Sequence, residues 1–143
     1  MINGKVYDWE SVTVGLPYGV AIAISGIDYD DELAGELAYG KGAAPVGYGN
    51  GNYTASAKIT MLRDEYNKLL DYARSQGKPL YRLPLFPITV SYANDGERTR
   101  TDEIRGCKFT KTTNKAAQGD TKLEVELELL VTGQIIRDGV KSI

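Results

Sequence analysis

Residues 26–70 read GIDYDDELAGELAYGKGAAPVGYGNGNYTASAKITMLRDEYNKLL, and this stretch decides the fold. An acidic turn is followed by a glycine-rich segment, then by an alternating segment, and last by an amphipathic one. The glycine-rich segment, residues 39–52, is about 14 residues long, whereas ordinary connections have roughly 4–6. We therefore expect residues 39–52 to form an extended loop that leaves the domain and packs on another subunit.

The second half of this stretch predicts a strand followed by a helix. Residues 53–60 alternate between apolar and polar side chains, as in a strand with one packed face and one wet face. Residues 62–74 change to a helical period, and Gly77 with Pro79 ends the helix. The apolar side chains at helical spacing predict the face that joins the core: Leu62, Tyr66, Leu69, Leu70 and Ala73.

Other segments also have the alternation of strands, at residues 5–14, 20–24, 88–92, 101–110 and 122–132. Within 101–110, a bulge at Gly106 is needed to place Ile104, Cys107 and Phe109 on one face. Residues 110–120 are polar and predict a loop.

The predicted fold class is mainly β: an antiparallel β-sandwich or barrel with one packed α-helix and a long extended loop. The 143 residues fit a single domain, residues 1–143. Within it we expect 39–52 to be the inter-subunit loop and 133–143 to be a C-terminal arm.

Composition excludes several classes of protein. The net charge of −2 gives no general attraction to nucleic acid or acidic membranes. The first ten residues lack the pattern of a secretory signal, and the apolar run at residues 20–24 is too short to span a membrane. The single cysteine, Cys107, excludes an intrachain disulfide and predicts a buried, unreactive side chain.

No catalytic or metal-binding set is predicted. The sequence has no histidine, which removes the commonest general base and metal ligand. Asp28, Asp30 and Glu32 have the first spacings of a calcium loop, but Leu33 and Tyr39 stand where glycine and glutamate are needed. We therefore expect neither enzymatic activity nor a cofactor.

A phosphate-binding loop is matched only in part. Residues 35–41 have its G-x-x-x-x-G-K pattern, but Gly42 replaces the serine or threonine that holds magnesium. No helix follows to receive the phosphate at its N-terminus. The glycines instead favour tight turns and close backbone packing.

Three carboxylates, Glu124, Glu126 and Glu128, share one face of the strand predicted at 122–132. Neighbours on one strand face lie about 7 Å apart and point in parallel, so they do not converge on one atom. We interpret them as a wet, negatively charged face.

The order of these segments resembles tail tube proteins of tailed bacteriophages, in the contractile-injection-system tube superfamily. Four motifs carry the resemblance, at residues 27–31, 39–47, 51–61 and 64–66. The later GCKFTKTTNKAAQGDTKLEVELELLVTG, residues 106–133, is similar to the closing strands of that family.

The resemblance implies a structural virion protein whose hexameric rings stack into the tail tube and conduct DNA during ejection. It implies as partners other copies of the chain, the tape measure protein, the baseplate hub and tail terminator proteins, and a tail sheath. It places the protein in the virion tail, assembled in the host bacterial cytoplasm. Related tubes serve phage-derived contractile injection systems, which is an alternative function.

The residues fit a tube wall. The subunit or ring interface is expected at Tyr39, Gly40, Lys41, Gly42, Pro45, Val46 and Tyr48. The lumen is expected to be lined by Thr54, Ser56, Lys58, Glu124, Glu126 and Glu128. Excess carboxylate repels phosphate, so passing DNA slides without sequence-specific binding.

Two alternatives come from other classes. One is a monomeric ligand-binding β-module whose tyrosines line a groove. The other is a histidine-free hydrolase built on Asp28, Asp30 or Glu32, which predicts dependence on a divalent metal.

Overall fold

The structure is a computed structural model that describes residues 6–94 and 96–143. Two short 3-10 turns, Trp9–Ser11 and Leu80–Arg82, accompany one α-helix, α1, Arg63–Gln76, within that part of the chain. The strands described are β1 Val12–Leu16, β2 Gly19–Ala21, β3 Ile24–Tyr39, β4 Pro45–Leu62, β5 Phe86–Tyr92, β6 Arg100–Lys115, β7 Glu124–Val131, β8 Ile135–Arg137 and β9 Val140–Lys141.

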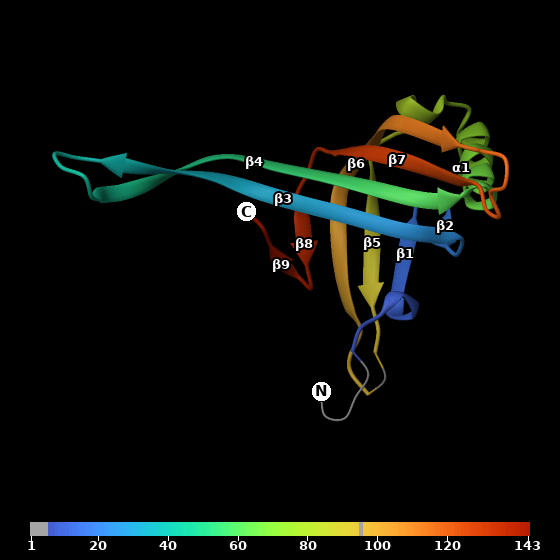
Figure 1. Ribbon diagram of the computed structural model, residues 1–143, viewed down its shortest axis with the longest axis horizontal. Coiled ribbons are helices and arrows are strands. Elements are labelled where there is room, and N and C mark those ends of the chain that lie inside the picture. Colours follow the sequence, from blue (N-terminus) through green and yellow to red (C-terminus); the bar gives the residue numbers. More distant parts are fainter. Residues whose placement is uncertain (1–5, 95) are drawn as a thin grey trace.

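All strand pairs are antiparallel, and the order across the sheet is β2-β1-β5-β6-β7-β4-β3, with β8 on β6 and β9 on β8. Figure 1 shows two layers, in which β3, β4 and β7 cross over β1, β5 and β8. The long strand β6 belongs to both layers, because residues 100–107 pair with β5 and residues 107–115 pair with β7. The predicted mainly β, sandwich-like fold is confirmed.

The strand β6 changes layer at Gly106, as the predicted bulge requires. The φ of Gly106 is +68°, and a Cβ there would lie 2.3 Å from Thr132 Oγ1. The pairing of β6 with β5 shifts register beside it. Ile104, Cys107 and Phe109 are consequently all buried.

The core lies between the layers and is closed at one end by α1. Alternate residues of β4, β5 and β7 point into it, and Leu69 of the helix is completely buried. The predicted helix is confirmed: it begins at Arg63, ends at Gln76 and is capped by Gly77, whose φ is +67°. Of its predicted apolar face, Tyr66, Leu69 and Ala73 are buried, while Leu62 and Leu70 are half-buried. No helix in residues 6–94 and 96–143 has the length and apolar content to cross a membrane.

The glycine-rich segment is not the loop that its composition suggested. β3 continues through the acidic residues to Tyr39, β4 begins at Pro45, and only residues 40–44 form the turn. The ladder pairs Leu37 with Tyr48 and Ala38 with Gly47. Glycine weakens a strand without preventing its backbone hydrogen bonds, so the ladder extends through a sequence that resembles a loop.

Other boundaries also differ from the prediction. β6 runs to Lys115, into the predicted loop, because Lys115 pairs with Glu124 of β7. Residues 133–143 do not form a free arm, since β8 pairs with β6 and β9 with β8. Near the N-terminus the strand begins only at Val12, and Lys5 of the predicted strand lies outside the described residues.

Candidate functional site

The hairpin β3–β4 extends far beyond the body of the protein. β4 pairs with β7 only from Ser56 to Leu62, so the hairpin has no neighbouring strand farther out. We call residues 33–53 the arm. Figure 1 shows it projecting from the two layers as a lone two-stranded ribbon. Such a ribbon cannot build a core, because it has no second layer to pack against.

The arm exposes large apolar side chains. Leu33, Leu37, Tyr39, Val46 and Tyr48 are all exposed, with fractions as high as 74% for Val46 and 76% for Tyr48. Alternation along β3 sets Leu33, Leu37 and Tyr39 on one face of the ribbon, and Leu37 lies opposite Tyr48. An apolar stripe of this kind on a projecting element is typical of a surface that another molecule covers.

The residues predicted as the subunit interface lie together at the outer end of this arm. Tyr39 pairs with Pro45, and the residues between them form the turn. Each is exposed: Tyr39, Gly40, Lys41, Gly42, Pro45, Val46 and Tyr48.

The residues predicted as lumen-facing also share one surface. Lys58 lies opposite Glu128, and Thr60 opposite Glu126, so the predicted side chains of β4 and β7 face the same way. β3 adds acidic residues to this surface and β6 adds lysines. We call it the polar face, and its charged members are Asp28, Asp30, Glu32, Lys58, Lys108, Lys111, Lys115, Glu124, Glu126 and Glu128.

The polar face has mixed charge, because lysines of β4 and β6 lie among its carboxylates. Glu126 lies 2.7 Å from the Lys115 ammonium and 3.3 Å from that of Lys58. The Lys115 and Lys58 ammonium groups lower the pKa of Glu126. Lys111 and Lys115 of β6 were missed because residues 110–120 were predicted to be a loop.

The sheet under the polar face has open edges on both sides. β3 is the outermost strand, with β4 as its only strand partner among the described residues. On the other side, no described strand pairs with residues 108–115 of β6 opposite β7. Unpaired N–H and C=O groups are therefore available for another chain at both edges.

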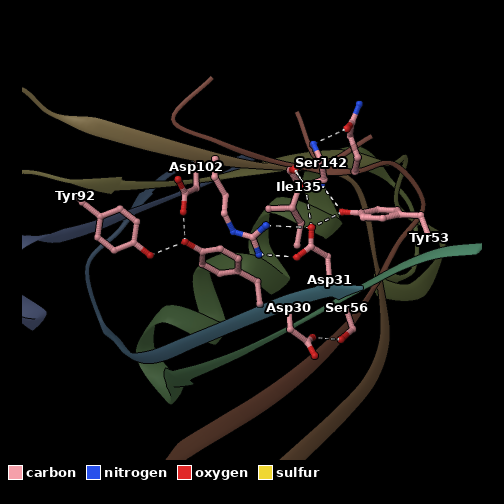
Figure 2. Close-up of polar contacts among 11 residues, drawn as sticks. Asp30, Asp31, Tyr53, Ser56, Tyr92, Asp102, Ile135 and Ser142 are labelled. Atoms are coloured by element: carbon pink, nitrogen blue, oxygen red, sulfur yellow. Dashed lines mark hydrogen bonds and ion pairs between the residues drawn. The ribbon is translucent and has the colours of Figure 1, made fainter. Parts of the chain in front are cut away.

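The arm is anchored where it leaves the body, as Figure 2 shows. The carboxylate of Asp31 accepts two hydrogen bonds from the Arg137 guanidinium, at 2.8 and 3.0 Å. It also accepts from the hydroxyls of Tyr53 and Ser142, each at 2.8 Å. These hydrogen bonds, those from Arg137 first, lower the pKa of Asp31 to about 2.

A second contact lies two residues before Asp31 on β3. The Tyr29 hydroxyl donates to Asp102 of β6 and lies 2.5 Å from that of Tyr92 of β5. The Arg137 guanidinium lies 5.9 Å from the centre of the Tyr29 ring. Burial, and then the hydrogen bond to Asp102, raises the pKa of the Tyr29 phenol. Nothing in the sequence pattern predicts this contact, because Tyr29 lies far from Tyr92 and Asp102 in the chain.

The opposite end of β3 is fixed by a buried carboxylate. Glu65 of α1 accepts from the Tyr18 hydroxyl and from the N–H groups of Ile22 and Ala23. Burial opposes its ionisation, but these hydrogen bonds prevail and its pKa is lowered. Glu65 therefore holds the connection between β2 and β3 in place.

No group of three or more Asp, Glu, Cys or His side chains within residues 6–94 and 96–143 is arranged to hold a metal ion. Asp30, one of the candidates for a hydrolase, accepts a hydrogen bond from Ser56 on the polar face. Burial raises the pKa of the Cys107 thiol to about 12, as expected of an inert core cysteine.

Known proteins resemble this chain in fold and not in sequence. No protein-family profile matches it, and no curated protein does. A chain from an extracellular contractile injection system, in the structure titled PVC sheath/tube terminator in the extended state, is 15% identical. The similarity covers 93% of this chain and 96% of that one, with a TM-score of 0.71.

Two further structures agree. Hcp1 from Flavobacterium johnsoniae is 12% identical, with 91% of this chain and 96% of that chain covered and a TM-score of 0.56. A chain of a native gene transfer agent particle is 8% identical, with 92% and 98% covered and a TM-score of 0.60. The fold that the resemblance implied is therefore confirmed, because this chain shares it with these three chains.

Proposed function

We propose that this chain is a structural subunit of a tail tube, which assembles as hexameric rings that stack into a hollow tube. The observation that carries the proposal is the arm: a long ribbon with an apolar stripe that no described part of the chain covers. The shared fold supports a role in a tail-like particle. As a structural subunit, the chain requires neither catalysis nor a cofactor.

The open edges support ring formation. The free edge of β3 and the free edge of residues 108–115 lie on opposite sides of one antiparallel sheet. Pairing of the first edge with the second edge of a neighbour is a heterologous contact, and such contacts close into rings when the rotation per subunit allows it. The arm then bridges to the neighbouring subunit or to the next ring.

The polar face supports a lumen. It presents charged and hydroxyl side chains over four neighbouring strands, and its carboxylates outnumber its lysines. A surface with a modest negative excess does not retain the phosphate backbone, so DNA passes without stable binding. In this proposal the tape measure protein occupies the lumen during assembly.

The remaining partners follow from a tube of finite length. Its ends contact a tail terminator and a baseplate hub, and a sheath surrounds it in a contractile tail. The protein is then located in the virion tail after assembly in the host bacterial cytoplasm. A tube of a phage-derived contractile injection system is the second candidate, favoured by the similarity to a chain from such a system.

The test is assembly of the purified chain, measured by light scattering and negative-stain electron microscopy. We expect rings or tubes that form as concentration rises. A variant with residues 36–49 replaced by Asn-Gly shortens the hairpin symmetrically, since Glu36 pairs with Gly49. We expect this variant to fold and remain monomeric.

If the variant with the shortened hairpin still forms tubes of normal density, the arm is not the contact between subunits. A wild-type chain that stays monomeric at all concentrations and salt conditions contradicts the tube and favours the monomeric ligand-binding module. Particle preparations distinguish the two tube candidates, because only a virion contains packaged DNA.

A further inference from the structure

The C-terminal residues converge on the root of the arm. Of the groups that bind the Asp31 carboxylate, Arg137 belongs to β8 and Ser142 follows β9. The Tyr53 hydroxyl, which donates to Asp31, accepts in turn from the N–H of Ile135 at 3.1 Å. Figure 2 shows these side chains pointing toward one another between the C-terminal segment and the hairpin.

The C-terminal segment is itself held in shape. The Ser142 hydroxyl contacts the Ile135 carbonyl as well as Asp31, and the Gln134 side-chain carbonyl accepts from the N–H groups of Ser142 and Ile143. β8 is paired to β6 over residues 102–104. A chain of contacts therefore runs from the body, through β8 and β9, to Asp31.

The contacts lie at the root of a long arm, so a small rotation there produces a large displacement at its outer end. Asp31 lies on β3 two residues before the arm begins, and the extended residues 32–39 separate it from the turn, a length of about 27 Å. At that length a rotation of about 10° at the root moves the outer end by about 5 Å. An arm whose direction is fixed beforehand loses less conformational freedom when it docks.

We propose that the C-terminal hairpin β8–β9 is a latch that sets the direction of the arm, with Arg137 and Ser142 as positioning residues that hold Asp31. The Asp31 side chain is 14% exposed, so the fork of the Arg137 guanidinium is largely shielded from water on the carboxylate side. The latch itself is independent of the proposed function, and only its consequence for assembly rests on that function.

The direct test is a distance distribution between two spin labels, at Lys41→Cys in the turn and Lys78→Cys after α1. Cys107 is buried, so the introduced cysteines are labelled selectively. In dilute monomer we expect one narrow distribution for the otherwise wild-type chain. We expect R137A, and separately D31N, to broaden it about twofold or more.

Matched variants separate the latch from general damage. R98A removes an exposed ion pair to Asp138 in the turn of the same hairpin and does not touch the arm root, so its distribution stays narrow. R137K keeps the charge but loses the two-pronged contact, and we expect an intermediate width. If R137A does not fold, R137K and S142A provide the same comparison.

Narrow distributions in R137A and D31N, or in both R137K and S142A, would overturn the proposal. In the assembly assay we expect R137A to raise the concentration at which tubes form about tenfold or more, with R98A unchanged. A wild-type chain that does not assemble contradicts the proposed function, while the label distances still decide whether the latch exists.

Discussion

At the scale of single residues, the backbone conformation of Gly106 lets the strand β6 pass from one layer to the other. Its positive φ is costly for any residue with a Cβ, and Thr132 and Gly133 occupy the space that a Cβ needs. The strand β6 bends between the two layers at this point. One residue therefore permits a single strand to serve both layers.

We expect Gly106→Ala to lower the free energy of unfolding by about 2–3 kcal/mol, from backbone strain together with the clash at Thr132. Urea denaturation measures the change. Gly119→Ala is the control, because Gly119 also has a positive φ but no atom within 4 Å of the added Cβ, and it should lose only about 1 kcal/mol. Equal losses in both variants would contradict the role of close packing at position 106.

Asp31 gives a prediction about pH. Its pKa is about 2 in the folded chain and 3.8 as a free side chain, so the folded structure stabilises the ionised form of the carboxyl group. The resulting stability is fully present above about pH 4 and is lost as the pH falls toward 2. We expect the loss to be on the order of 1 kcal/mol, allowing for screening by solvent.

Thermal unfolding between pH 2 and 5 checks this prediction, with Asp31→Asn as the comparison. The variant should show a smaller decline in melting temperature over that range, because it has no carboxyl group to protonate at this position. An NMR titration of the Asp31 carboxyl carbon that gives a midpoint near 4 would contradict the contacts described for it.

At the scale of elements, the arm has a regular backbone ladder but leaves its apolar side chains exposed. Its ladder is continuous from Leu33 to Tyr39 apart from register shifts beside Leu33 and Ala38. Its apolar side chains have no second layer in the chain to cover them. We therefore expect these apolar side chains to be buried only when the arm contacts another molecule.

We expect the double variant Leu37→Ser and Tyr48→Ser to leave the body folded and to abolish or strongly reduce tube formation. These side chains lie opposite each other on the ribbon and are exposed, so their loss costs the monomer less than about 1 kcal/mol. Circular dichroism and sedimentation measure folding and assembly. Leu85→Ser is the control, because Leu85 is an exposed apolar residue on the body. Tubes formed by the double variant at wild-type concentration would show that the stripe is not the contact.

At the scale of the whole molecule, charge on the polar face decides what can pass over it. We expect reversal of Glu124, Glu126 and Glu128 to lysine, in assembled particles, to slow DNA ejection, because a positive face retains phosphates. The effect should weaken as salt concentration rises. Ejection kinetics followed by dye release measure it, with particle number and tube length as controls. Unchanged kinetics in intact tubes would argue against a lumen at this face.

The sequence predicted most of the elements within the layers. The periodicity of residues 53–74 located a strand and the helix that follows it, and the phase change around Gly106 revealed a bulge. Both inferences worked because burial on one face imposes a period of 2 or 3.6 on neighbouring residues. The residues predicted to face the lumen lie on one face of the sheet, and those predicted as the interface lie together at the outer end of the arm, while both roles stay predictions.

The errors arose where burial does not act. The arm is exposed on both faces, so nothing in its composition distinguishes a ladder from a loop, and its glycines favoured the wrong choice. Residues 110–115 of β6 carry polar side chains for the same reason and were predicted to be a loop. The arm and residues 110–115 are strands because their backbones hydrogen-bond to a partner strand. Such bonds leave no periodic pattern in the side chains.

The sequence by itself determined the fold class, the position of the helix, the bulge in β6 and the absence of histidine chemistry, because these depend on residues close together in the chain. The tertiary structure alone decided that the glycine-rich segment is an arm, that lysines balance part of the acidic face, and that Arg137 holds Asp31. Those features join residues as far apart as positions 31 and 137, and only folding brings such pairs within the few ångströms over which hydrogen bonds and ion pairs act.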